Sequence, residues 1–214
     1  MDVILMSYTT GALVVCETAA AICTAASNQR KALQHAVGSG HTSVLEHASY
    51  TFKITGLSRV ALAQLTRHRL ASFSVQSQRY VKMNSPEMVM PKSISESSFS
   101  QEAESSMRYM ANLYQRMVEG GIPKEDARYI MPQAVTTELI VTMNARELHH
   151  FFSLRTCNRA QWEIRAVADK MLTLCREVSP TLFEDAGPGC VTGQCPEKKP
   201  CGHPRKSSDW EVGT

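Results

Sequence analysis

The sequence predicts a single α+β domain, in which a mixed or antiparallel sheet is flanked by helices. Three observations support this class: β-prone segments are few, helical segments lie between them, and strands and helices do not alternate regularly as they do in a doubly wound fold. With 214 residues the chain can form one substantial core. We therefore expect one domain over residues 1–185, followed by a tail over residues 186–214 that is rich in Gly, Pro, Cys and Lys and lacks periodicity.

The beginning of the chain predicts a strand and then helical structure. Residues 3–5 are apolar and predict the first strand. Residues 17–26 are rich in alanine and contain neither Gly nor Pro, so they favour a helix. Gly38 and Gly40 are expected to end whatever structure residues 28–37 form.

The next segment contains an alternating pattern. Ser43 and Glu46 have the spacing of a capping box, which is one possible, purely structural role for both. In residues 50–55 apolar and polar side chains alternate, as in a half-buried strand, and Gly56 is expected to close that strand. Residues 57–69 then predict a helix that leads into a run of basic residues.

Residues 93–106 are rich in Ser and Glu, and this segment is expected to begin as a surface loop. Residues 107–117 supply a helical apolar face that Gly120 ends. Pro123 is suited to the first position of a short helix that carries Arg128.

The last third predicts one strand and two helices. Residues 134–142 are β-prone, and Asn144 can cap the following helix, where Phe151 and Phe152 fall on one face. Residues 160–177 give the clearest helix, because their apolar side chains follow the 3, 4, 7 spacing almost without exception.

Composition limits the classes of function. A net charge of +3 is too small for bulk nucleic-acid binding, so any basic function must be local. The seven cysteines, an odd number, and the absence of a basic segment before the first apolar stretch predict a cytoplasmic protein with reduced thiols. Residues 11–26 are the most apolar stretch, but Glu17 interrupts them and they are too short to span a bilayer, so we expect no membrane segment.

An anion-binding site is predicted by residues 67–79, which contain three guanidinium groups, one imidazole and three hydroxyl groups. On a continuous helix, Gln64, Arg67 and His68 would share one face, and Arg69 would point elsewhere. In an extended segment, Ser77 and Arg79 would face the same way and could grip a phosphate. The alternative interpretation is a solvated basic helix end.

A second cationic group follows in the helix after Asn144. Arg155 continues the apolar face of this helix, so its guanidinium needs a buried partner or a bound anion. Arg146 and His150 are four residues apart and line a neighbouring face, although a pair of surface residues is as plausible. No nucleophile elbow, Walker loop or dinucleotide fingerprint is present, so we expect a cofactor to supply the reactive chemistry.

The arrangement of Arg67-His68-Arg69, followed after seven residues by Ser77, resembles the RHR-x7-S motif of flavin-dependent thymidylate synthases. Further segments resemble blocks of that family in the same order: residues 41–47, Gln64, residues 127–132, 144–146, 154–155 and 160–164. The chain departs from the usual pattern where Ser74-Val75 replaces Asn-Glu.

The resemblance implies a homotetrameric methyltransferase with the fold of the thymidylate synthase-complementing proteins. Such an enzyme belongs to dTMP biosynthesis and converts dUMP to dTMP. It takes the one-carbon unit from methylenetetrahydrofolate and the hydride from NADPH by way of FAD. FAD, dUMP and the folate would meet at subunit interfaces, with no role for nucleic acid or a membrane.

The resemblance also implies roles for individual residues. Those that look like the flavin shell are His41, Ser43, Glu46, Arg67, His68, Arg69, Asn144, Arg146 and His150. Those that look like the nucleotide shell are Gln64, Arg67, Gln76, Ser77, Gln78, Arg79, Arg128 and Arg155. Arg155 would hold the pyrimidine, and Arg155 and Ser77 are the expected catalytic residues.

Two other classes of function remain open. One is a nucleic-acid-binding module that uses the arginine cluster with Phe73 and Tyr80, and the other is a related flavoprotein that acts on a different nucleotide.

The cysteines raise a further question. Cys16, Cys23 and Cys157 are expected to be packing residues. The tail contains a weak candidate metal site, which lacks a close Cys-x-x-Cys pair, so a disordered or loosely packed tail is the main expectation. Its candidate ligands are Cys190, Cys195, Cys201 and His203.

Overall fold

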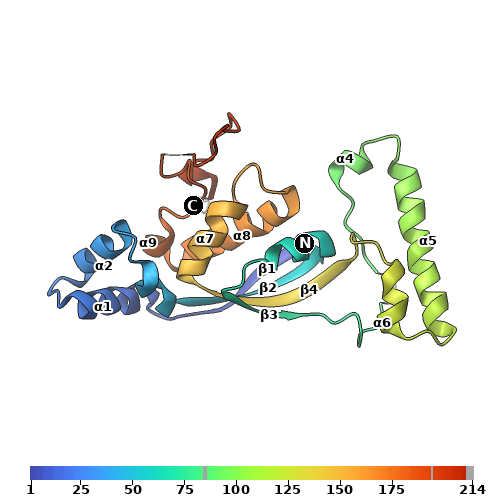
Figure 1. Cartoon of the computed structure of the whole chain (residues 1–214), viewed down its shortest axis with the longest axis horizontal. Coiled ribbons are helices and arrows are strands. Elements are labelled where there is room, and N and C mark those ends of the chain that lie inside the picture. The colour runs from blue at the N-terminus through green and yellow to red at the C-terminus, as the bar shows by residue number, and fades with distance from the viewer. Residues whose placement is uncertain (84–85, 194, 211–214) are drawn as a thin grey trace.

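The computed structural model describes residues 1–83, 86–193 and 195–210. It contains a four-stranded antiparallel sheet with the strand order β1-β2-β4-β3 (Figure 1). The strands are β1 (Asp2–Tyr8), β2 (Ser49–Ser58), β3 (Ala71–Val75) and β4 (Thr136–Asn144). The predicted α+β class is therefore confirmed, and the sheet is antiparallel.

The helices fall into three groups (Figure 1). Near one end of the sheet lie α1 (Ala12–Thr24), α2 (Gln29–Gly38) and the 3-10 helix η1 (Thr42–His47). Packed on the sheet are α3 (Arg59–Leu65), α7 (Ala145–Arg155), α8 (Trp162–Val178) and α9 (Pro180–Phe183). An arm at the other end carries α4 (Lys92–Ser95), α5 (Ser100–Glu119), α6 (Lys124–Ala127) and η2 (Arg128–Ile130).

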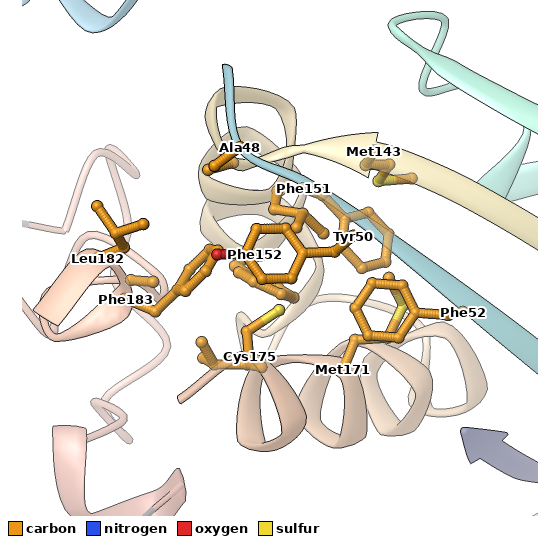
Figure 2. Packing of buried hydrophobic residues seen from close by; sticks show 14 of the residues in the cluster. Ala48, Tyr50, Phe52, Met143, Phe151, Phe152, Met171, Cys175, Leu182 and Phe183 are labelled. Atoms are coloured by element: carbon orange, nitrogen blue, oxygen red, sulfur yellow. The ribbon is translucent and has the colours of Figure 1, made fainter. Parts of the chain in front are cut away.

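The core lies between β2 and helices α7 and α8 (Figure 2). The alternation predicted for residues 50–55 is confirmed, because Tyr50, Phe52 and Ile54 are fully buried. Figure 2 shows Phe52 beside Met171 of α8. The Tyr50 hydroxyl donates a hydrogen bond to Ser179 Oγ over 2.8 Å, so the polar end of this buried ring is satisfied.

Gly56 does not close the second strand, contrary to expectation. The ladder with β4 shifts register between Ile54 and Leu57, and the strand then continues to Ser58. Gly56 adopts φ +69°, and a Cβ at this position would lie 3.1 Å from the backbone of Met1. Glycine is needed here because it accepts the left-handed conformation and the close approach at a bulge, so the strand bends without ending.

The capping box that was one possible role for Ser43 and Glu46 does not form. Residues 42–47 form a 3-10 helix with no side-chain cap. The Glu46 carboxylate instead pairs with Arg146 of α7, at 2.5 Å from Nη1. The Glu46 side chain thus bonds to a residue distant in the sequence and does not cap the helix end, as its local spacing suggested.

The segment around the arginine cluster differs from both local predictions. Helix α3 ends at Leu65, so Arg67 and His68 lie beyond the helix and do not continue its face. The chain then enters β3, which we did not predict, and pairs with β4. Residues 77–80 form a turn and are not extended, since the amide of Val81 donates to the carbonyl of Ser77.

The helices of the second half follow the predicted patterns more closely. Asn144 caps α7, because its Oδ1 accepts a hydrogen bond from the Glu147 amide at 2.9 Å. The predicted apolar faces of α7 and α8 are buried. In the arm, α5 begins at Ser100, inside the segment expected to be a loop, and Tyr114 is its one buried residue.

The tail is packed more closely than predicted over its described part, which excludes Gln194 and residues 211–214. Trp210, in the 3-10 helix η3 (Ser207–Trp210), is only 2% exposed and belongs to the core. Its Nε1 donates to Asp169 of α8 over 2.8 Å, and Arg205 lies over its ring at 4.5 Å. Within the described residues, no helix is long and apolar enough to cross a membrane.

Candidate functional site

A cavity of about 610 Å³ lies between the segment that follows α3 and one side of α7. We call it the cationic cavity, and its walls carry four arginines, two histidines and one glutamate. The lining residues are Arg67, His68, Arg69, Leu70, Arg146, Glu147, His150, Leu154 and Arg155. This excess of positive charge favours an anionic ligand.

Helix α7 positions three of the groups that matter most. Glu147, Phe151 and Arg155 are spaced by four residues, so they lie on one face at successive turns. Glu147 and Phe151 are buried, and Arg155 is partly buried. The Asn144 cap fixes the residue at which this helix begins, and therefore the position of each of these side chains along the helix axis.

His68 lies against this face and connects its two charged ends. His68 Nδ1 and Glu147 Oε1 are 3.0 Å apart, and Arg155 Nε lies 3.1 Å from His68 Nε2. Because a guanidinium can only donate, Nε2 must accept, which assigns the ring proton to Nδ1. Arg155 Nη2 also donates to the Gln64 carbonyl over 3.4 Å, which adds a contact at the end of α3.

The surroundings of His68 favour a neutral ring. Burial lowers the pKa of His68, and the nearby Arg155 guanidinium lowers it further, whereas the hydrogen bond to Glu147 opposes the shift. Burial and the proximity of Arg67 lower the pKa of Arg155 as well. Arginine begins from so high a pKa that it remains charged at neutral pH. The neutral imidazole is thus held between a carboxylate and a cation.

Several residues predicted for the flavin shell lie in or beside the cationic cavity. Arg67 and Arg69 are exposed in its wall, and the His150 ring lies 5.7 Å from that of His68. Glu46 lies at the edge through its ion pair with Arg146. His41 immediately precedes η1 and Ser43 lies within it, and both are exposed and outside the lining. Asn144 uses its side chain as the helix cap.

The remaining nucleotide-shell residues form a second group, which we call the Arg79 group: Gln76, Ser77, Gln78, Arg79 and Arg128. Glu125 of α6 links its two arginines, because its carboxylate lies 2.7 Å from Arg79 Nε and its carbonyl accepts from Arg128 Nε at 3.0 Å. The amide of Arg79 donates to Ser77 Oγ over 3.2 Å.

The two glutamines make other contacts. Gln76 donates to Glu138 Oε1, and Gln78 contacts Met83 Sδ. None of these five residues lines the cationic cavity. That they surround one nucleotide together with Arg155 stays a prediction, because the resemblance places this nucleotide at a subunit interface.

Two residues of these sites were missed in the sequence. Glu147 could have been found from its spacing, because it shares a face with Phe151 and Arg155. Arg59 is the first residue of α3, where the helix dipole disfavours a cation. It donates to the Gln76 carbonyl over 3.2 Å, and its buried Nε has no hydrogen-bond partner among the described residues. Burial and the nearby Arg128 lower its pKa.

The cysteines give little support to a metal site or a nucleophile. A second cavity of about 420 Å³ is lined partly by Cys157, Cys190, Cys195, Cys201 and His203. Nevertheless, among residues 1–83, 86–193 and 195–210, no group of three or more His, Cys, Asp or Glu could hold a metal ion. The weak metal hypothesis for the tail is therefore not supported.

Outside the tail, Cys16 is buried as expected, and burial together with Glu17 raises its pKa to about 11. Cys157 is partly buried. Cys23 is exposed, so its predicted packing role is wrong.

Comparisons with known proteins agree with the resemblance noted in the sequence. The model of the family described as thymidylate synthase complementing protein matches residues 4–181. A flavin-dependent thymidylate synthase of Geobacter sulfurreducens is 56% identical over 161 residues, which cover 74% of this chain and 69% of that protein. The enzyme of the same name from Pyrococcus abyssi is 46% identical over 177 residues, which cover 78% and 72%.

A solved structure is also similar. It is a UMP/dUMP methylase, PolB, from Streptomyces cacaoi bound with 5-Br dUMP. The two chains superpose with a TM-score of 0.75 and 26% identity, over 86% of this chain and 93% of the other.

Proposed function

The chain belongs to the thymidylate synthase complementing protein family, and from this we propose that it converts dUMP to dTMP by reductive methylation with FAD as its flavin. Methylenetetrahydrofolate is the proposed one-carbon donor and NADPH the proposed reductant. The observation that carries the proposal is the hydrogen bond from Arg155 to His68 in a cavity lined by four arginines. We place the enzyme in the cytoplasm, in nucleotide biosynthesis.

The cationic cavity fits a flavin dinucleotide by its chemistry. Arg67 and Arg69 are exposed in its wall, and neither forms an ion pair with another described residue, so both are available to a pyrophosphate. Together with Arg146 and His150 they would hold the cofactor, with His41, Ser43, Glu46 and Asn144 at the edge. His68 would contact it only through the exposed part of its ring, because both ring nitrogens already bond to Glu147 and Arg155. When bound, the flavin supplies the redox chemistry that the protein side chains lack.

For the nucleotide, we propose two kinds of contact. Arg155 would orient the pyrimidine and, as a fixed donor, stabilise negative charge that develops on a ring oxygen. Ser77, Gln78, Arg79 and Arg128, with Gln76 and Gln64, would hold the phosphate and sugar. No cysteine is needed as a nucleophile, which agrees with the raised pKa of Cys16.

The separation of the two cationic groups supports an assembly with shared sites. Within one chain the Arg79 group is not part of the cationic cavity, although both are proposed to bind the same nucleotide. We therefore propose that neighbouring copies contribute one group each, in a homotetramer. The arm supports this view, because α5 is 20 residues long yet buries Tyr114 alone against its own chain.

The choice of nucleotide has a second candidate. The similar solved structure is named a UMP/dUMP methylase, which favours UMP as the alternative substrate. Discrimination between the two requires a contact near the ribose 2′ position, because only UMP carries a hydroxyl there. A nucleic-acid-binding role gains no comparable support, since the chain carries a net charge of only +3.

The experiment that tests the proposal is a complete reaction with the flavin-loaded protein, dUMP, methylenetetrahydrofolate and NADPH, in which dTMP is identified by mass spectrometry. We expect dTMP only when all components are present, and no product from Arg155→Ala. A parallel reaction with UMP in place of dUMP tests the second candidate. Absence of both methylated nucleotides, from a preparation with a normal flavin absorbance band, would contradict the proposed function.

A further inference from the structure

We infer that Glu147 is a positioning residue that fixes the orientation of Arg155 through the ring of His68. The inference deepens the proposed function and rests on it, because Arg155 is the proposed pyrimidine contact. Glu147 itself contacts His68 and not the pyrimidine, so its role is indirect. It lies outside every motif that marked this chain as a member of its family.

The burial of Glu147 requires a reason. The residue is only 4% exposed, and an unpaired carboxylate at such a position would be costly. It occupies the third position of α7, where a glutamate commonly reaches back to the capping residue. Its Oε1 instead lies 3.0 Å from His68 Nδ1. A side chain suited to local capping is thus directed to a residue 79 positions earlier in the sequence.

The carboxylate determines which nitrogen of His68 carries the proton. A neutral imidazole has one donor and one acceptor nitrogen, and an ionised carboxylate can only accept. The proton therefore resides on Nδ1, and Nε2 is left to accept from Arg155 Nε at 3.1 Å. In the opposite tautomer, two N–H groups would face each other, and this hydrogen bond would be lost.

Packing holds the His68 ring in the orientation that its contacts with Glu147 and Arg155 require. The Phe151 ring meets His68 edge to face, with centroids 4.9 Å apart, and His68 is only 4% exposed. Glu147, Phe151 and Arg155 belong to the same helix, so their spacing is set by the α7 backbone. Through the imidazole, Glu147 can therefore influence the orientation of the Arg155 guanidinium two turns later on the same helix face.

The consequence for Arg155 is a guanidinium with one edge occupied. Nε is taken by His68, and Nη2 donates to the Gln64 carbonyl. Among the described residues no partner takes the hydrogens of Nη1, and Arg155 lines the cationic cavity. Fixing one edge of a planar fork of donors orients the others, so a ligand need not supply the ordering itself.

The first test compares dUMP affinity in four flavin-loaded proteins: wild type, Glu147→Gln, Arg155→Ala and the double variant. Glu147→Gln keeps the shape of the side chain but can also donate to Nδ1, so the tautomer is no longer fixed. We expect this variant to bind dUMP about tenfold more weakly by calorimetry. In the Arg155→Ala background the same substitution should cause no further loss, because the two residues act through one chain of contacts.

Glu163→Gln is the matched control. Glu163 is also a buried glutamate, 2% exposed, but it bonds to the amide and hydroxyl of Ser58. We expect Glu163→Gln to lower thermal stability and leave dUMP affinity unchanged. Wild-type affinity in Glu147→Gln, or a further loss when it is added to Arg155→Ala, would overturn the inference.

A second readout does not depend on the nucleotide. Nitrogen-15 spectra of histidine-labelled protein report which ring nitrogen of His68 carries the proton. We expect the Nδ1–H form in wild type and in Glu163→Gln, and a mixture of both forms in Glu147→Gln. If wild type neither binds dUMP nor makes dTMP, the proposed function fails, and the tautomer decides the inference alone. An unchanged pure Nδ1–H form in Glu147→Gln would then reject it.

Discussion

Arg155 donates a hydrogen bond to the Nε2 of His68 over 3.1 Å, although the two residues are 87 positions apart in the sequence. The contact explains two features of the sequence. One is the arginine on the apolar face of a helix, and the other is the histidine between two arginines. The contact also requires that His68 stay neutral, because a protonated ring could not accept from a guanidinium.

The stability of the protein should therefore fall as the pH falls below 6.5. Burial lowers the pKa values of both His68 and His149 in the folded state. Below pH 6.5 the unfolded chain therefore binds protons that the folded chain does not, so the free energy of unfolding decreases with decreasing pH until the folded pKa is passed. Each histidine contributes at most about 1.4 kcal/mol per pH unit. The charged and titratable groups that lie around His68 are Glu147, Arg155, His150, Arg67 and Arg146.

Denaturant unfolding between pH 7.5 and 5.5, at one fixed protein concentration, measures this slope. His149→Asn should reduce it while retaining a donor for the Leu182 carbonyl, which His149 Nε2 meets at 2.8 Å. His35→Asn, which replaces an exposed histidine, is the control. A wild-type slope that His149→Asn leaves unaltered would show that His149 does not bind fewer protons when folded.

The sequence predicted the elements whose contacts are local or periodic. The α8 face and the Asn144 cap follow from spacing alone, since each depends on residues within a few turns. Strand β3 and the partner of Glu46 could not be derived in this way. Residues 71–75 gain their strand conformation from pairing with β4, and Glu46 meets Arg146 across 100 positions. Tertiary partners decided these cases against local preference.

The candidate site was predicted in its residue types more fully than in its arrangement. The sequence alone predicts Arg67, His68, Arg146 and Arg155 as site residues, and they line one cavity. The separation of the Arg79 group could not be seen in the sequence, because motif order says nothing about distance. Glu147 was missed because a glutamate near a helix start has an ordinary structural explanation.

Gly56→Ala should destabilise the protein, by about 1–3 kcal/mol. Both the left-handed φ of +69° and the backbone of Met1 at 3.1 Å oppose a side chain at this position. Gly11→Ala is the matched control, because Gly11 has a similar φ of +66° but open space around it. Thermal unfolding should show a larger loss for Gly56→Ala, and equal losses would mean that the contact with Met1 contributes nothing.

Trp210→Ala should lower the free energy of unfolding by about 3–5 kcal/mol, the usual cost of removing a buried aromatic side chain. The indole is 2% exposed, and its Nε1 donates to Asp169, so the substitution leaves both a cavity and a carboxylate without this partner. Trp162→Ala, at a residue that is 44% exposed, is the control. Denaturant unfolding of both variants measures the difference. A loss no greater than that of Trp162→Ala would instead support the loosely packed tail that the sequence predicts.

Two inactive variants should restore activity to each other if neighbouring copies share sites. Arg155→Ala disables the cationic cavity, and Arg79→Ala disables the Arg79 group, which does not line that cavity in the same chain. In mixed assemblies, some sites receive an intact cavity from one copy and an intact Arg79 group from another. Random mixing in equal amounts should leave about a quarter of the sites intact, because each site needs two unaltered contributions.

The measurement is dTMP formation by proteins that are co-expressed with different affinity tags and purified through both tags. Arg155→Ala co-expressed with Arg67→Ala is the matched control, because both residues line the same cavity of one chain and the mixture should stay inactive. Activity in the first mixture alone assigns the two groups to different copies. An inactive first mixture, from verified mixed assemblies, would instead require the arm to bring Arg79 to the cationic cavity of its own chain.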